Sequence, residues 1–284
     1  MSKSSKKVDK QMEENIAQFC GVTNASVKDA RKFLDKYKRL EIAVDAYFNG
    51  PPAAATPTSS SAPSTAKLNT LFDQYKDPDE ADTIKVDGTL RWCEDLGIEA
   101  DDVVTLALAL ELGSKELGTW AKKNWVDGWK RLGADSLEGM KPVLRTLSNK
   151  LASDADYFHR VYNQAFELAK AEGQRSLTID SAQAFWEMLL PFGLRGGALS
   201  HVSSAVDGED VDMDSTEEGF QEKHVKWWFD FLNQRGKGVT KDTWQMLYEF
   251  IRSIDSKFTK YDMEAAWPST IDDFVEYAKT RAAQ

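Results

Sequence analysis

Apolar residues recur at helical spacing along most of the chain. Near its C-terminal end, Ile271, Phe274, Val275 and Ala278 fall at positions i, i+3, i+4 and i+7, which together line one face of a helix. No stretch shows the polar–apolar alternation that marks a strand. We therefore predict an all-α domain over residues 68–282. Its candidate helices cover residues 68–75, 87–96, 101–112, 120–132, 137–151, 154–171, 181–190, 219–233, 241–254 and 270–282.

Three shorter helical patterns precede this domain and predict a small three-helix bundle over residues 8–50. Ser26, with Asp29 three residues later, resembles a capping box at the start of the middle pattern. The apolar positions are Met12, Ile16 and Phe19 in the first pattern, Val27, Ala30 and Leu34 in the second, and Leu40, Val44, Tyr47 and Phe48 in the third.

Two stretches lack any helical pattern. Residues 51–67 consist of Pro, Ala, Ser and Thr up to Ala66, a composition that cannot form a core and predicts a flexible linker. Residues 191–218 begin Gly/Ser-rich and then carry seven acidic side chains between Asp207 and Glu218. We interpret residues 191–218 as a disordered acidic insertion between two helices.

The overall charge narrows the classes of partner. A net charge of −10 and a pI near 5.0 argue against a general nucleic-acid binder and favour a basic protein partner. Two cysteines, Cys20 and Cys93, are too few for a disulfide framework and suggest a reducing compartment. Residues 1–10 lack the apolar core of a signal peptide, and the apolar run at 103–112 is too short to span a bilayer. We expect a soluble intracellular protein in the cytoplasm, the nucleus or both.

One loop resembles a calcium site. Asp77, Asp79 and Ile84 fall on the first, third and eighth positions of an EF-hand loop. However, Asp82 stands where the sharp turn needs glycine, and Gly88 stands where the bidentate glutamate belongs. We expect EF-hand-like helix pairs that hold no metal and serve as a packing scaffold, with calcium sensing as the alternative.

Catalytic patterns have little local support. Cys93 lies on an apolar helical face without an adjacent histidine, so a buried structural thiol is the simpler interpretation and a thioester acceptor the alternative. The histidines and cysteines form no zinc pattern, and no Walker phosphate loop is present. Core packing accounts for most of the nine tryptophans, and some could line a groove for an apolar peptide. We predict a binding protein without cofactors.

Five blocks of sequence carry a family resemblance. They are Gln74–Pro78, Ile84 with Val86–Gly88, Cys93–Leu96, Lys241–Trp244, and Ala266–Pro268 with Ile271–Ala278. These blocks closely resemble the Defective in Cullin Neddylation family, whose potentiating-neddylation domain matches from residue 68 to the end of the chain. Residues 8–50 are similar to the UBA-like domain that precedes it in some members.

The resemblance implies a non-catalytic ligase component. Such proteins hold a cullin and the charged conjugating enzyme together, so that the ubiquitin-like modifier passes to a cullin lysine. The family's cullin-binding set falls on Asp242, Ala266 and Asp272. The residues agree with this, because Thr240 can cap a helix whose first turn holds Asp242, and Ser269 or Thr270 can cap the one holding Asp272. Complementing the positive helix ends is the simpler role for these carboxylates.

A second site is implied for the N-terminal methionine of the conjugating enzyme in its acetylated form. Acetylation removes an ammonium whose burial in an apolar pocket would be costly. The positions that resemble the family's pocket are Val86, Thr89, Cys93, Thr105, Leu108, Ala109, Leu112, Leu117, Trp120, Leu168, Phe185 and Met188.

The UBA-like resemblance implies binding of ubiquitin or of the ubiquitin-like modifier. Phe19-Cys20-Gly21-Val22 stands where such domains carry a Met-Gly-Phe/Tyr loop. A ubiquitin receptor whose helical domain recruits another basic partner is therefore the alternative to a neddylation scaffold.

Overall fold

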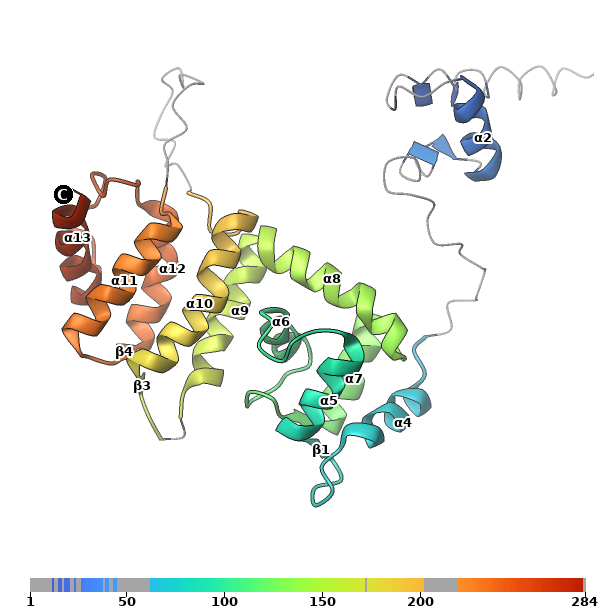
Figure 1. Ribbon diagram of the computed structural model, residues 1–284, viewed down its shortest axis with the longest axis horizontal. Helices are drawn as coiled ribbons and strands as arrows, with labels where there is room; N and C mark the ends of the chain where they lie inside the picture. Colours follow the sequence, from blue (N-terminus) through green and yellow to red (C-terminus); the bar gives the residue numbers. More distant parts are fainter. Residues whose placement is uncertain are drawn as a thin grey trace, which may run out of the picture. The chain divides into compact units, whose positions relative to one another are not determined.

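The computed structural model divides the chain into two compact units, residues 1–61 and 62–284 (Figure 1). In the second unit it describes residues 62–171, 173–201 and 219–282. In the first it describes residues 12, 15, 16, 18–20, 23, 27–37, 39, 40, 43 and 44. None of the described helices combines the length and the apolar content needed to cross a membrane.

The N-terminal unit has its own apolar core. Helix α2 (Val27–Tyr37) contributes Ala30 and Leu34, and Phe19 lies buried beside them with its ring 5.9 Å from that of Phe33. This agrees with the small helical bundle that the apolar spacing predicts. Ser26, Tyr47 and Phe48, three further residues of that prediction, lie outside the described residues. Ile16 and Ala43 complete the buried cluster, against which Met12, Cys20, Tyr37, Leu40 and Val44 pack.

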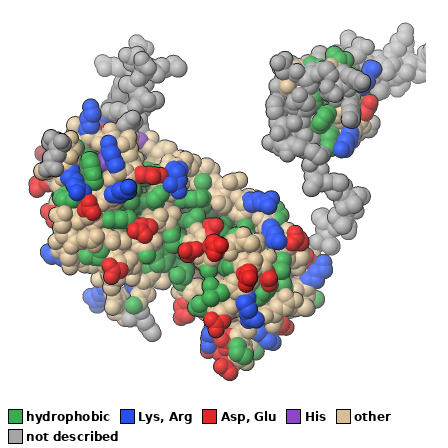
Figure 2. Space-filling model, in the orientation of Figure 1, with side chains coloured by type: hydrophobic (Ala, Val, Ile, Leu, Met, Phe, Trp, Pro, Cys, Tyr) green, Lys and Arg blue, Asp and Glu red, His purple; other side chains and the backbone are tan. Residues whose placement is uncertain are grey.

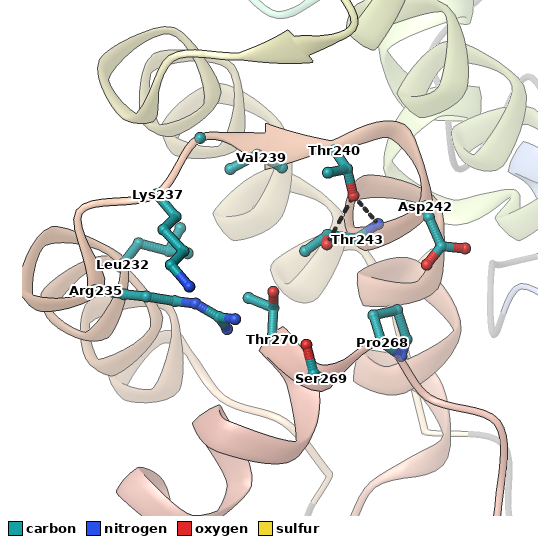
Figure 3. Close-up of a pocket in the computed structure, with 11 residues that line it drawn as sticks. Leu232, Arg235, Lys237, Val239, Thr240, Asp242, Thr243, Pro268, Ser269 and Thr270 are labelled. Atoms are coloured by element: carbon teal, nitrogen blue, oxygen red, sulfur yellow. Dashed lines mark hydrogen bonds between the residues drawn. The ribbon is translucent and has the colours of Figure 1, made fainter.

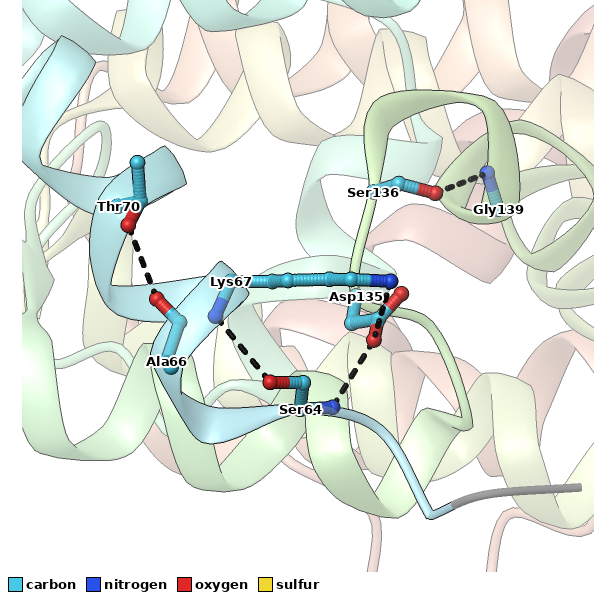
Figure 4. A network of polar contacts seen from close by, with 7 residues as sticks. All are labelled: Ser64, Ala66, Lys67, Thr70, Asp135, Ser136 and Gly139. Carbon is cyan, nitrogen blue, oxygen red and sulfur yellow. Dashed lines mark hydrogen bonds and ion pairs between the residues drawn. The ribbon is translucent and has the colours of Figure 1, made fainter.

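The large unit begins with helix α4 (Thr65–Tyr75), which a polar network attaches to the loop before α8 (Figure 4). Ser64 caps the helix by accepting the amide of Lys67. Asp135 accepts the amide of Ser64 at 2.9 Å and lies 3.5 Å from the ammonium of Lys67. The helix therefore starts three residues before the predicted residue 68, and the last residues of the predicted linker belong to α4.

Helices α4 and α5 (Val86–Leu96) form the first EF-hand-like unit, and α6 (Val104–Glu111) and α7 (Lys122–Leu132) form the second. Strands β1 (Thr83–Ile84) and β2 (Trp120–Ala121) join the two loops as an antiparallel pair, in which Ile84 lies opposite Trp120. Strands of two residues are too short to show an alternation, which is why the sequence pattern did not reveal them. Trp120 and Ala121 are thus strand rather than the start of α7.

Two long helices follow, α8 (Leu137–Ser153) and α9 (Ala155–Ala169). Ser136 caps α8 by accepting the amide of Gly139, and Asp154 caps α9 by accepting that of Tyr157. Helix α8 packs against α5 and α6 on one side and α10 on the other, so it connects the two halves of the unit (Figure 1).

The second half repeats the arrangement with α9 and α10 (Ile179–Gly196), then α11 (Glu222–Arg235) and α12 (Lys241–Ser253). Its loops join through β3 (Ser176–Leu177) and β4 (Val239–Thr240), with Leu177 opposite Val239. Helix α13 (Ser269–Ala282) packs against α11 and α12 and closes the fold.

Helix α10 corrects the predicted boundary of the acidic insertion. It continues through Pro191 to Gly196 and ends at Gly197, whose φ is +92°; Leu199 beyond it is buried. The glycines that suggested a loop are sites of close packing: a Cβ on Gly196 would lie 2.4 Å from the carbonyl oxygen of Ala152. Residues 191–201 therefore belong to the helical fold, and the rest of the predicted insertion, 202–218, lies outside the described residues.

Seven of the nine tryptophans are buried in the core, as predicted for most of them, and Trp227 and Trp267 pack against it. Trp92 meets Trp125 and Trp129 edge-to-face at 5.7 and 6.1 Å in the first half. In the second half Trp186 stacks on Trp244 at 4.7 Å. The visible surface carries acidic and basic side chains side by side, with hydrophobic side chains between them (Figure 2).

Candidate functional site

Asp242 is an exposed carboxylate in the first turn of α12. The Thr240 hydroxyl accepts the amide of Thr243 at 3.2 Å, so the helix has the predicted cap. Strand β4 ends at Thr240, and its pairing with β3 fixes where α12 begins. The carboxylate of Asp242 therefore projects from a rigidly held helix end.

Asp272 lies in the first turn of α13, as predicted, but its surroundings differ from those of Asp242. It is half-buried and accepts a 2.6 Å hydrogen bond from the hydroxyl of Tyr261. Burial, and then this carboxylate, raise the pKa of Tyr261 well above its ordinary value, so the phenol stays protonated as the donor. Ser269 and Thr270 lie inside the helix rather than before it.

The segment between α12 and α13 carries the third predicted residue, Ala266, which is exposed. Beside it, Trp267 stacks on Tyr261 at 6.0 Å and meets Phe250 edge-on. The segment begins at Asp255, whose buried carboxylate accepts the amides of Lys257 and Lys260 and the hydroxyl of Thr259, the last at 2.8 Å. These bonds hold the loop that presents Ala266.

The pKa of Asp255 is lower than its ordinary value. Burial opposes its ionisation more than any single contact favours it. The bonds from Lys260, Thr259 and Lys257 together outweigh this and lower its pKa. The carboxylate is thus charged at neutral pH and keeps its role as acceptor.

A pocket of about 330 Å³ lies between the starts of α12 and α13. Asp242, Pro268, Ser269 and Thr270 are among its lining residues, so the structure brings the first predicted carboxylate to the start of the helix that carries the second. Ala266 and Asp272 do not line it. Figure 3 shows Arg235 and Lys237 on the side of the pocket opposite Asp242.

Arg235 and Lys237 were missed by the sequence reasoning, although a Gly-rich turn with two cations between helices was a visible signal. Arg235 lies 3.0 Å from the carboxylate of Asp273. Asp273 is therefore already paired within the fold, whereas its neighbour Asp272 bonds to a neutral phenol.

An apolar pocket of about 170 Å³ lies in the first half of the unit. Six of the predicted pocket residues line it, together with Leu90, Ala100 and Gly118, which were not predicted. Its rim holds three exposed apolar side chains, with Val86 55%, Leu90 50% and Leu117 50% exposed. The six predicted residues are Val86, Thr89, Thr105, Ala109, Leu117 and Trp120.

The polar atoms of this pocket are already hydrogen-bonded. The hydroxyl of Thr89 donates to the carbonyl of Gly118 at 2.8 Å and accepts the indole N–H of Trp120 at 2.8 Å. The hydroxyl of Thr105 donates to the carbonyl of Asp102 at 2.7 Å. Both threonines therefore have their hydroxyls engaged within the protein, and the pocket is chemically apolar.

The other predicted pocket residues do not line this cavity. Cys93, Leu108 and Leu112 are buried in the core because they lie on the inward faces of their helices. Leu168 on α9, and Phe185 and Met188 on α10, belong to or pack against the same core without reaching the cavity.

Comparison with known proteins connects these features. The family model described as cullin binding matches residues 139–277, and that described as a UBA-like domain matches residues 13–53. Defective in cullin neddylation protein 1 of Cryptococcus neoformans is 40% identical over 93% of this chain and 92% of that protein. The chain belongs to the Defective in cullin neddylation protein 1 family. The protein of that name from Mycosarcoma maydis is 31% identical over 98% of this chain and 96% of its own, and DCN1-like protein 4 of Drosophila melanogaster is 29% identical over 75% of each.

In the loop that resembles a calcium site, a lysine side chain of the protein itself pairs with the carboxylates. The ammonium of Lys85 lies 2.7 Å from the carboxylate of Glu80 and 3.7 Å from that of Asp77. Asp77 also accepts the amides of Asp79 and Glu80. The described residues contain no cluster of three metal-ligating side chains.

Proposed function

We propose that this chain is the scaffold component of a cullin neddylation ligase. It binds the C-terminal region of a cullin through Asp242, Ala266 and Asp272. It binds the acetylated N-terminus of the conjugating enzyme in the apolar pocket beside Trp120. The modifier then passes from the enzyme to a cullin lysine, without a covalent intermediate on this chain.

The observation that carries the proposal is the exposed Asp242 at a capped helix start, beside the helix that holds Asp272. Both residues fall within the stretch that matches the cullin-binding family model. A carboxylate fixed by its helix loses little freedom when a lysine or arginine docks, and the helix end favours its ionised form. Ala266 adds an exposed small side chain on the intervening loop, which leaves room for the partner.

The pocket supports the second half of the proposal. Its hydroxyls are engaged internally, so a charged amine entering it would find few compensating acceptors and would pay a desolvation cost. An acetylated methionine presents an apolar side chain and an uncharged end. The exposed rim residues Val86, Leu90 and Leu117 can be covered by the segment that follows the methionine.

The mechanism is proximity. Holding donor and acceptor on one chain raises their effective concentration, which replaces a bimolecular encounter by an intramolecular one. The state of Cys93 favours this over thioester chemistry, because burial, followed by the nearby Asp102, raises the pKa of its thiol to about 11. A protonated, buried thiol is a poor nucleophile.

The N-terminal unit does not lead us to prefer the ubiquitin-receptor alternative. Phe19, which stands where such domains carry a Met-Gly-Phe/Tyr loop, is helical and buried in the unit's own core. With Cys20 and Cys93 both unpaired, we assign the protein to a reducing compartment, the cytoplasm or the nucleus.

The test is binding of a purified cullin C-terminal fragment to a charge-neutralised variant, Asp242→Asn with Asp272→Asn. Asparagine keeps an acceptor for Tyr261, so the fold should be preserved. We expect at least a tenfold weaker affinity by calorimetry, since carboxylate–cation bonds are among the stronger interface contacts.

Asp180→Asn is the matched control, because Asp180, like Asp242, is exposed and lies in the first turn of a threonine-capped helix, α10. It should bind like the unmodified protein. We call Asp242 and Asp272 together the acidic patch. Unchanged affinity in the double variant, with unchanged far-UV circular dichroism, would refute the acidic patch as the cullin site.

A further inference from the structure

The pocket between α12 and α13 has more hydrogen-bond donors than the acidic patch needs. Asp242 lies on one side, and Arg235 and Lys237 lie on the other, with the start of α13 between them (Figure 3). The head groups of both cations point toward Thr270. A partner that offered only a cation to Asp242 would leave Arg235 and Lys237 without a negative group to bind.

Arg235 and Lys237 differ in how firmly the fold holds them. Arg235 is held in place by Asp273 at 3.0 Å and by the ring of Phe231, 5.9 Å from its guanidinium. Its side chain is only 17% exposed, so its orientation is restricted. Lys237 is exposed, and no carboxylate of the described residues lies within 4.0 Å of its ammonium. One cation is preorganised and the other is unpaired.

The remaining polar groups of the pocket point to the same kind of ligand. The hydroxyls of Thr240 and Thr243 are 3.0 Å apart and bond to each other. Those of Ser269 and Thr270 form no hydrogen bond with the described residues and are available as donors. The amides of Ile271 and Asp272 in the first turn of α13 donate to the carbonyl of Pro268, so the side chains supply most of the available donors. Apart from the single carboxylate of Asp242, the cavity lining is rich in donors.

We propose that this pocket receives a carboxylate of the cullin, adjacent to the basic residue that docks on Asp242. This inference rests on the proposed function and specifies the partner further: the docked segment must present a cation and an anion side by side. Lys237 and Arg235 bind the carboxylate, and the hydroxyls of Ser269 and Thr270 complete its hydrogen bonds. An isolated basic residue would bind Asp242 and leave the two cations unpaired. A requirement for an adjacent cation and anion therefore makes the site specific for segments that carry both.

Binding of the cullin C-terminal fragment to the full chain carrying Lys237→Glu tests this. We expect an affinity at least tenfold lower, because a bound carboxylate would then face a like charge. Lys237→Arg should retain most of the affinity. Lys226→Glu is the matched control, because Lys226 is an exposed lysine of α11 that does not line the pocket and its substitution changes the net charge equally.

The outcomes separate this inference from the proposed function. If Lys237→Glu behaves like Lys226→Glu while Asp242→Asn with Asp272→Asn still weakens binding at least tenfold, the carboxylate pocket is wrong and the cullin site stands. If none of these changes weakens binding, both fall. Replacing each acidic residue of the fragment by lysine should identify one that restores binding to Lys237→Glu.

The same scan identifies the source of the carboxylate. Rescue by a side-chain replacement identifies an aspartate or glutamate. Loss of the Lys237 dependence in a fragment with an amidated C-terminus identifies the chain end instead. Failure of every replacement and of the amidated fragment to alter the Lys237 dependence would overturn the proposal.

Discussion

At the scale of single residues, His224 shows how burial fixes a protonation state. The ring is fully buried, and Phe220, Trp227 and Phe258 surround it with centroids about 5 Å away. Its Nδ1 accepts the amide of Gln221 at 3.0 Å, which helps to cap α11. Burial, followed by the nearby Lys223, lowers its pKa to about 4.

This predicts a loss of stability in mild acid. The folded protein keeps His224 neutral, whereas the unfolded chain takes up a proton near pH 6.5, so stability is lost as the pH falls from 6.5 toward 4. Between pH 7 and pH 5 the loss is about 2 kcal/mol in the free energy of unfolding. Urea unfolding at both pH values should show this, and His224→Gln should reduce the pH dependence. An equally steep dependence in the variant would exclude His224 as its cause.

The candidate site was predictable from the sequence only in part at this scale. Asp242 and Thr240 could be recognised because helix caps are local in sequence. The pairing of Asp273 with Arg235, and the bond from Tyr261 to Asp272, join residues brought together by the tertiary fold. Spacing therefore could not tell which of the two neighbouring carboxylates is already used.

At the scale of elements, helix packing explains why the loop between α4 and α5 departs from the calcium-binding pattern. A Cβ on Gly88 would lie 2.0 Å from the carbonyl oxygen of Tyr75 and 2.9 Å from a methyl of Ile84. Helix α5 thus approaches the end of α4 so closely that the twelfth loop position must be glycine. Close packing of two helices occupies the space of the missing glutamate, and Lys85 supplies the charge of the missing ion.

We therefore predict that Gly88→Ala destabilises the large unit. Backbone atoms cannot move aside as a flexible side chain can, so the cost is about 2–3 kcal/mol, or roughly 5–10 °C in the melting temperature. Gly139→Ala is the control, because the closest atom to its Cβ would be the Ser136 hydroxyl oxygen at 3.2 Å. Calorimetric melting should separate the two variants. Equal melting temperatures would mean that α4 and α5 can separate without cost.

The observed helices begin close to their predicted positions wherever the sequence signals for a helix start are local. Helices α5, α8 and α12 begin within a residue of their predicted positions, because periodicity and caps coincide there. The prediction failed at α10, where Pro191, Gly193 and Gly196 looked like a helix end. Gly193 lies against Phe158 and Gly196 against Ala152, and these tertiary contacts let the helix continue past the proline.

At the scale of the whole molecule, the two proposed sites lie in different halves of one compact unit. The apolar pocket is built from α5, α6 and the loop before β2, and the acidic patch from α12 and α13. Helices α8 and α9 connect the halves through a continuous core. A rigid connection of this kind suits a scaffold, since it fixes the separation between the two bound partners.

This arrangement predicts that the two sites must act within a single chain. Leu117→Glu places a charge on the rim of the apolar pocket, and Asp242→Asn with Asp272→Asn neutralises the acidic patch. Each variant should lose most of the stimulation of modifier transfer to the cullin fragment. An equimolar mixture should do no better than either variant alone, because each chain holds only one of the two partners.

The reason lies in effective concentration. Two partners on one chain experience each other at roughly millimolar concentration, whereas partners on separate chains meet only at their bulk concentration. Gel-based transfer assays at micromolar enzyme can resolve that difference, and unmodified protein added to the mixture provides the positive control. Recovery of transfer in the mixture would show that the two sites work independently of each other. Tethering requires that no such recovery occurs at any ratio of the two variants.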